Sequence, residues 1–154
     1  MKPVVTIVPA GMDHIASIAA RMREADRTEV WASSRSTPHN SLMISLQNSR
    51  WAMTALVDGQ PEVMWGVADL NILTGTGAPW LLGTDAVEAN YRLFLRHSLQ
   101  WKEKLSEQYQ VLMNFVHDEN EVSKRWLKWL GFTLSEPFEL GLDGELFRMF
   151  EMRR

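Results

Sequence analysis

The chain has 154 residues, of which 45% are hydrophobic and 23% charged, so we expect one domain that buries a core without metals or disulfides. A formal net charge of −3 gives no electrostatic case for binding nucleic acid or an anionic membrane. The absence of cysteine excludes disulfide frameworks, thiolate zinc sites and cysteine nucleophiles.

The first residues, the lengths of the apolar stretches and the spacing of the histidines argue against secreted, membrane-spanning and metal-binding proteins. The first residues hold one lysine and a short apolar run broken by Pro9, which is unlike a signal peptide. No stretch approaches the roughly 18 apolar residues that a membrane span needs. The four histidines have no metal-binding spacing. We therefore expect a cytoplasmic protein without a membrane span or a metal.

The first third of the chain predicts one strand and two helices. Residues 4–8 form an apolar run that stops at Pro9 and Gly11, which is typical of a strand. Ile15, Ile18 and Met22 recur at helical spacing, and the pattern predicts a helix over 12–31. Thr37 and Pro38 then begin a shorter helix that ends near residue 48.

The middle of the chain predicts three strands and the longest helix. Residues 50–57 and 62–71 are strand-like, and Asp58-Gly59 between them indicates a hairpin. A turn over 74–77 leads to an apolar strand over 78–82. Its Gly-Thr-Gly precedes a strand instead of opening a helix, so we interpret it as turn chemistry and not as a phosphate loop. A helix follows over 85–109.

Residues 111–132 are the most informative stretch. An apolar run over 111–116 predicts a buried strand, and Asp118 or Asn120 is placed to cap the next helix. That helix has Trp126 and Leu127 on its apolar face and ends at Gly131. A hairpin over 133–140 and 146–152 closes the chain. A long helix between two strands suits a parallel crossover, so we predict an α/β (α+β) layered domain with a mixed, mostly antiparallel sheet.

The element order and the 111–132 stretch resemble the GCN5-related N-acetyltransferase (GNAT) superfamily over essentially the whole chain. The matching signature is an apolar strand, an Asn, a small residue three positions on, and then Gly-Phe; these are Asn120, Ser123, Gly131 and Phe132. A narrower resemblance is to the GNAT-like internal virion or core proteins of short-tailed phages and related prophage proteins. It is carried by Trp80, Leu81, Leu82, Thr84, Asp85, Arg92, Phe94, Arg96, Tyr109, Leu112, Asn114, Val116, Asn120, Arg125, Leu127, Lys128 and Gly131.

The resemblance implies a three-layer sandwich whose two central parallel strands splay apart and bind acetyl-CoA or another acyl-CoA. A pantetheine chain can pair with the strand edges that the splay leaves free. The diphosphate would then lie at the following helix N-terminus, over residues 83–90. The implied cofactor-binding residues are Leu82, Gly83, Thr84, Asn114, Asn120 and Arg92. Asn114, in an apolar strand, either pairs internally or offers its amide to a ligand, and Arg92 with Arg96 either binds an anion or remains solvated.

The implied reaction is transfer of the acyl group to an unknown amine. His117 at the end of its strand, or Asp69, is the predicted general base. Two features depart from the superfamily pattern. The 83–90 turn has one glycine and carries Asp85 and Glu88, and Leu127 stands where a general-acid Tyr is usual.

These departures keep a second hypothesis open. In it the protein is a catalytically silent, GNAT-like phage virion-assembly or internal core protein that acts by protein–protein binding and is virion-associated. An open V between the two central strands would favour the first hypothesis, and a gap plugged by a side chain such as Trp80 the second. The acceptor, the acyl group and the oligomeric state, including a homo-oligomer, stay open at this stage.

Overall fold

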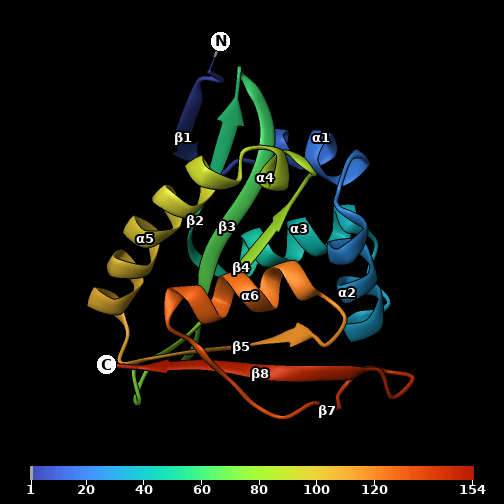
Figure 1. Ribbon diagram of the computed structural model, residues 1–154, viewed down its shortest axis with the longest axis vertical. Coiled ribbons are helices and arrows are strands. Elements are labelled where there is room, and N and C mark those ends of the chain that lie inside the picture. The colour runs from blue at the N-terminus through green and yellow to red at the C-terminus, as the bar shows by residue number, and fades with distance from the viewer. Residues whose placement is uncertain (1) are drawn as a thin grey trace.

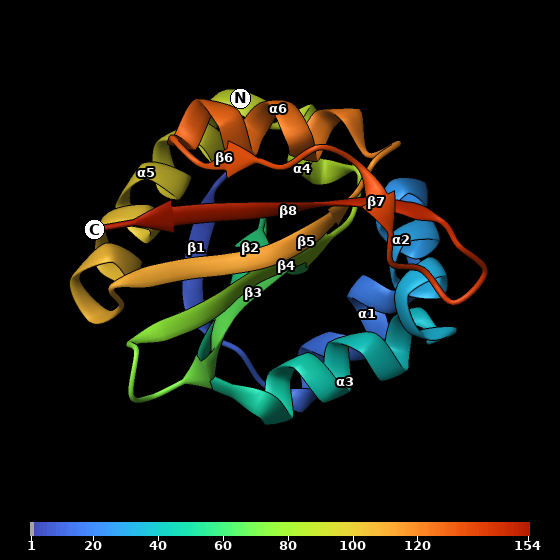
Figure 2. The same cartoon turned by 90° about the horizontal axis from the view of Figure 1, so that it is seen from below.

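A mixed β-sheet forms the middle layer of the protein, and helices cover both of its faces (Figures 1 and 2). The computed structural model describes residues 2–154. The strands are β1 (Val5–Pro9), β2 (Ser49–Val57), β3 (Gln60–Asn71), β4 (Thr76–Gly83), β5 (Val111–His117), β6 (Thr133–Leu134), β7 (Phe138–Glu139) and β8 (Leu146–Arg153). The helices are a 3₁₀ turn η1 (Met12–His14), α1 (Ile15–Ala20), α2 (Glu24–Ser34), α3 (Pro38–Asn48), α4 (Ala86–Ala89), α5 (Tyr91–Gln108) and α6 (Glu121–Leu130).

The sheet order is β1-β2-β3-β4-β5-β8-β6, with β7 paired to β8. Its one parallel pair is β4–β5, and the other pairings are antiparallel, as the element order predicts. β4 and β5 pair only at their first residues, Thr76 with Val111 and Gly77 with Leu112. Beyond these pairs the two strands diverge, and in Figure 1 the V between them opens toward α2. The predicted α+β fold with a splayed central pair is confirmed.

Each face of the sheet has its own apolar core, because successive strand residues point to opposite faces. Helices α1 and α3 cover one face, where the buried side chains are Ile15, Ile18, Met22, Leu42, Met64 and Leu82. Helices α5 and α6 cover the other face. The side chains buried there are Val67, Trp101, Leu105, Tyr109, Leu112, Val116, Trp126, Leu127, Leu130, Phe132 and Phe150. The two helix layers therefore lie above and below the V.

Two predicted helices are each broken in the structure. The helix predicted over 12–31 stops at Ala20 and restarts at Glu24. Between them, Met22 forms an antiparallel bridge with Thr84, and the Arg23 N–H donates to the Gly83 carbonyl at 2.9 Å. The helix predicted over 85–109 is divided at Asn90, whose side-chain amide donates to the Ala86 carbonyl. In the first case a tertiary pairing, and in the second a local side-chain bond, overrides helical spacing.

Gly131 ends α6 with φ of +103°, in the left-handed region that a β-carbon disfavours. We expect Gly131→Ala to lower the free energy of unfolding by about 1 kcal/mol, measured by urea denaturation. Nothing crowds the added methyl group, since its nearest neighbours lie 3.6 Å away, so the cost reflects backbone conformation. Gly131→Asn should cost less, because Asn tolerates this region; an equal loss for both variants would contradict this explanation.

None of the helices within residues 2–154 has the length and apolarity required to cross a bilayer.

Candidate functional site

The V between β4 and β5 contains a cavity of about 470 Å³. Its floor is formed by Pro79, Leu82, Asn114 and Val116 of the two strands, and further residues from α2, α3, α5 and α6 form its walls. Trp80 lines the cavity but leaves it open, because its indole N–H donates to Ser49 Oγ at 2.7 Å. The expected opening between the central strands is therefore present.

The register of β3 and β4 shows which backbone groups of β4 point into the V. The Thr84 N–H donates to the Glu62 carbonyl, so Thr84 and, by alternation, Leu82 and Trp80 bond to β3. The backbone groups of Pro79, Leu81 and Gly83 consequently point away from β3. Pro79 has no N–H to offer. Leu81 thus contributes one N–H and one carbonyl to the opening where β5 has diverged.

Asn114 spans the V near its closed end. Its side-chain amide donates to the Pro79 carbonyl at 2.9 Å, and its Oδ1 accepts from the Phe115 N–H at 2.9 Å. Of the two alternatives predicted for this amide, the structure shows internal pairing. Asn114 thereby satisfies a strand carbonyl that the splay would leave without a partner.

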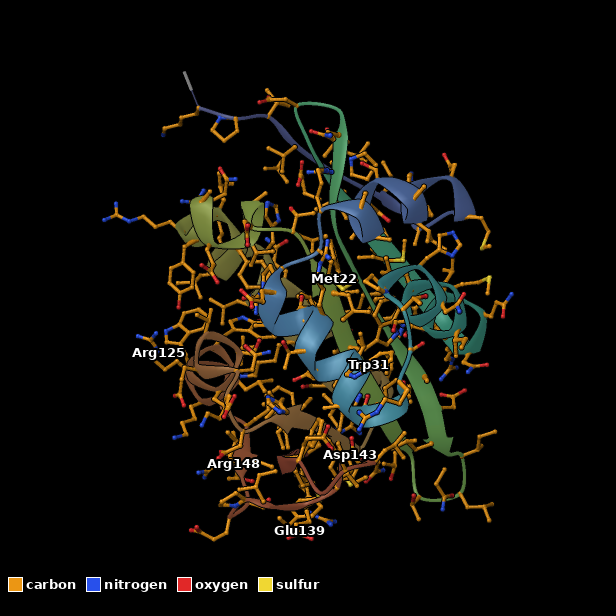
Figure 3. The ribbon with its side chains drawn as sticks, turned by 90° about the vertical axis from the view of Figure 1, so that its right-hand side faces the viewer. Met22, Trp31, Arg125, Glu139, Asp143 and Arg148 are labelled. Carbon is orange, nitrogen blue, oxygen red and sulfur yellow. The ribbon has the colours of Figure 1, made fainter. Side chains whose placement is uncertain are left out.

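Helix α2 and its N-cap lie across the wide end of the V and carry three ionisable side chains, of which Glu29 lines the cavity. Figure 3 looks onto this helix, which runs from near Met22 to Trp31 between α6 and α3. Arg23, Asp26 and Glu29 are spaced by three residues and share one helical face. Arg23 and Asp26 are 4% and 3% exposed, and an ion pair of 3.3 Å joins them.

Asn120 connects α2 to the start of α6. Its Oδ1 caps α6 by accepting from the Ser123 N–H at 3.3 Å, and it also accepts from Arg23 Nη2 at 3.2 Å. Its Nδ2 donates to Glu29 Oε1 at 3.5 Å. Asn120 rather than Asp118 is therefore the N-cap, and Asp118 instead forms ion pairs with Lys124 and Arg148.

Burial raises the pKa of both α2 carboxyl groups. The pKa of Glu29 rises from 4.5 to about 7, first because of desolvation and then because Asp26 lies nearby. The pKa of Asp26 rises from 3.8 to about 6, where desolvation outweighs the opposing effect of Arg23. Glu29 lines the cavity and titrates near neutral pH, which are two properties expected of a general base.

Backbone N–H groups in the predicted diphosphate turn already donate hydrogen bonds within the protein. The Gly83 N–H donates to Asp26 Oδ2 at 3.1 Å, and the Thr84 N–H to the Glu62 carbonyl at 2.9 Å. The N–H groups of Ala86 and Val87 donate to Thr84. These four N–H groups are consequently not available to an anion. Leu82, Gly83 and Thr84 are buried at the end of β4.

The predicted bases lie away from the cavity. Asp69 is at the closed end of the V, where it accepts a hydrogen bond from the Tyr109 hydroxyl and lies 3.9 Å from Arg50. The backbone N–H of His117 donates to Glu29 Oε1 at 2.8 Å. The imidazole ring, however, packs edge-on against Phe147, and His117 lines a separate pocket of about 330 Å³. Arg92 is exposed in the first turn of α5, directly after the predicted diphosphate turn.

Three buried polar atoms of cavity-lining residues have no hydrogen-bond partner within the described chain. They are Ser41 Oγ, Trp101 Nε1 and Trp126 Nε1. The two indoles stack in parallel, 5.6 Å apart, where α5 meets α6. Buried donors without acceptors are rare in folded proteins.

Sequence reasoning missed Arg23, Asp26 and Glu29, although a signal was present. Ile15, Ile18 and Met22 form an apolar stripe, and the next positions on that stripe are Asp26 and Glu29. Carboxylates at core-facing positions indicate a buried polar site. Within residues 2–154 no group of three or more acidic or histidine side chains is arranged to hold a metal ion.

Comparison of the sequence with protein-family models and with curated proteins finds no match. The fold is that of solved GNAT acetyltransferases. An N-acetyltransferase from Staphylococcus aureus Mu50 superposes with a TM-score of 0.72 at 12% identity, covering 97% of this chain and 98% of the other. A GNAT-family acetyltransferase from Streptococcus pneumoniae superposes with a TM-score of 0.63 at 12% identity, covering 97% of this chain and 99% of the other. The ribosomal L7/L12 alpha-N-protein acetyltransferase RimL, in complex with coenzyme A, superposes with a TM-score of 0.63 at 5% identity, covering 97% of this chain and 93% of the other. The chain therefore has the GNAT fold.

Proposed function

We propose that this protein is an acyl-CoA-dependent N-acyltransferase acting on a primary amine in the cytoplasm. The observation that carries the proposal is the V between β4 and β5, which holds a cavity of about 470 Å³. The GNAT neighbours include a complex with coenzyme A, which supports acyl-CoA as the co-substrate. The thioester would supply the activated acyl group.

The residues of the V fit the acyl-pantetheine part of such a molecule. The Leu81 carbonyl points into the opening and can accept a hydrogen bond from an N–H of an extended amide chain. The turn after β4 does not fit a diphosphate, because its N–H groups are used internally. Arg92, exposed beside this turn, is our proposed partner for the phosphates.

In the proposed reaction, the amine nitrogen bonds to the thioester carbon while its proton passes to a carboxylate. Glu29 is better placed for this role than the predicted His117 and Asp69, because it lines the cavity. The Leu81 N–H would stabilise the developing oxyanion. Collapse of the intermediate breaks the carbon–sulfur bond and releases a thiolate. Leu127 has no proton to give, so we expect the thiolate to take its proton from water.

Calorimetric titration with acetyl-CoA tests this proposal. We expect micromolar binding to the unmodified protein and at least tenfold weaker binding to Ser123→Trp, since Ser123 lines the cavity and an indole there would fill it. A tenfold loss corresponds to about 1.4 kcal/mol. Lys128→Trp, on the exposed side of the same helix, is the matched control and should bind normally. Absence of binding at millimolar acetyl-CoA would refute the enzyme proposal.

One observation favours a second candidate function. The end of β4 is hydrogen-bonded to α2 and β3, so its backbone groups have partners without a cofactor. A protein that has kept the fold and acts by protein–protein binding would look like this. The resemblance to internal virion proteins implies phage structural proteins as its partners. Under this alternative, neither the unmodified chain nor Ser123→Trp would respond to acetyl-CoA.

A further inference from the structure

The cavity in the V has an unusual charge pattern. Among the described residues that line it, Glu29 is the one ionisable side chain. The remaining lining is aromatic, aliphatic or neutral polar, and includes Phe115, Phe147 and Phe150. The cavity therefore offers one carboxyl group and no cation to whatever enters it.

One carboxylate oxygen of Glu29 is hydrogen-bonded within the protein, and the other is available to a ligand. Oε1 accepts from the His117 N–H at 2.8 Å and from Asn120 Nδ2 at 3.5 Å, which fixes the carboxyl group against β5 and α6. Oε2 has no partner among residues 2–154. A carboxylate with a free oxygen in a largely apolar cavity favours a cationic or N–H-bearing ligand group.

The two arginines near the cavity form ion pairs with other residues of the protein. Arg23 lies against Asp26 and Asn120 and does not line the cavity. Arg35 pairs with Asp143 and Glu145 and stacks over Trp31, so its charge is directed to another part of the surface. A ligand carboxylate or phosphate in the cavity would thus be desolvated beside Glu29 without a positive partner, which is strongly unfavourable.

Part of the cavity lining is neutral and rich in serine. These residues are Ser33, Ser34 and Ser36 at and beyond the end of α2 and Ser41 and Ser45 of α3. Ser41 is 8% exposed, and its Oγ has no partner. These groups can bond a neutral polar substituent but cannot balance a full negative charge.

We propose that the acceptor bound in this cavity is a primary amine on a neutral, aromatic or aliphatic body, and that Glu29 selects its amino group against anionic analogues. The aromatic lining buries the body, and Glu29 Oε2 binds the nitrogen. As an acceptor class the inference rests on the proposed acyl transfer. As a binding preference it concerns Glu29 and the cavity alone.

The test is calorimetric titration of the full chain at pH 8 with three probes of one shape: 2-phenylethylamine, 2-phenylethanol and phenylalanine. Each titration is done without and with free coenzyme A. We expect 2-phenylethylamine to bind at least tenfold more tightly than phenylalanine, which adds a carboxylate, and more tightly than the alcohol. Glu29→Gln should remove the preference for the amine over the alcohol. Glu24→Gln, on the exposed part of the same helix, should leave the preference unchanged.

Two results would overturn the inference. One is phenylalanine binding as tightly as 2-phenylethylamine, and the other is no binding of any probe at millimolar concentration in either condition. The proposed function fails separately. If the amine binds as expected and acetyl-CoA does not, the cavity is an amine site without acyl transfer. If acetyl-CoA binds and the amine preference is absent, the acyltransferase proposal stands and the acceptor class is wrong.

Discussion

Replacing Glu29 with Gln is expected to stabilise the protein at pH 8 by about 2–3 kcal/mol. The carboxyl group is held against β5 and α6 in a partly buried position, and its pKa is raised from 4.5 to about 7. A shift of one pKa unit corresponds to about 1.4 kcal/mol. At pH 8 the glutamate is charged in both states, and its charge is desolvated in the folded protein but hydrated in the unfolded chain. Gln keeps an oxygen for the His117 N–H and has no charge.

The raised pKa values of Glu29 and Asp26 determine how the stability of the protein changes with pH. A carboxyl group whose pKa is raised by folding contributes stability below its unfolded pKa, and that stability is lost as the pH rises through its folded pKa. For Glu29 and Asp26 the loss occurs as the pH rises through about 7 and about 6. The unmodified protein should therefore have a higher melting temperature at pH 5.5 than at pH 8. The lowered pKa of Asp118, held by Arg148 and Lys124, acts in the opposite direction and destabilises the fold in stronger acid.

Thermal denaturation followed by circular dichroism from pH 5 to pH 8.5 measures this. Glu29→Gln should flatten the pH dependence and raise the melting temperature by several degrees at pH 8 while changing it little at pH 5. Glu24→Gln, exposed in the first turn of α2, is the matched control and should follow the unmodified protein. An equal effect of both substitutions would show that helix charge, and not burial of Glu29, governs the pH dependence.

Replacing Asn120 with Ala is expected to lower the free energy of unfolding by about 3 kcal/mol. The substitution removes the cap of α6, which is worth about 1 kcal/mol. It also removes the acceptor of a hydrogen bond from the buried Arg23, and bonds to charged groups contribute about 1.5–3 kcal/mol. Arg23 would keep its ion pairs with Asp26 and Glu88, while its Nε has no partner among the described residues. Urea denaturation at neutral pH gives the value.

Thr37→Ala is the control for the capping contribution alone. Thr37 caps α3 by accepting from the Asn40 N–H at 3.2 Å, but it is exposed and bonds to no buried charge. We expect a loss of about 1 kcal/mol. If Asn120→Ala costs no more than Thr37→Ala, Asn120 is a cap only, and the buried contacts between α2 and α6 do not contribute to stability.

Sequence patterns predicted the strands and caps best where local chemistry decides the structure. Asp58 and Gly59 both adopt positive φ in the β2–β3 turn, as an Asp-Gly hairpin requires. Thr37 and Gly131 begin and end their helices as predicted. Trp126 is buried and Trp129 is half exposed, which follows from their positions on α6. Each of these features depends on residues within a few positions of one another.

The site was less predictable because it depends on contacts between distant segments. The break at Arg23 results from pairing with Gly83, 60 residues later, which no helical spacing reveals. Asn114 bonds to Pro79 only because the strands separate at that level. Glu29 becomes a candidate base only when α2 lies across the V. The proposed role of His117 depends on where its ring points, and strand alternation alone did not decide this.

The short contact between β4 and β5 also bears on how the protein opens. Two residue pairs join β1–β4 to the β5–β8 part of the sheet, whereas the pairings on either side of this junction run for seven or more residues. Cooperative unfolding units commonly follow such boundaries. Native-state amide exchange should therefore divide the sheet at this junction, with the N-terminal and C-terminal halves protected to different extents. Helix α2 couples the two units, because Asp26 accepts a hydrogen bond from the Gly83 backbone N–H in one half and Glu29 accepts one from the His117 backbone N–H in the other.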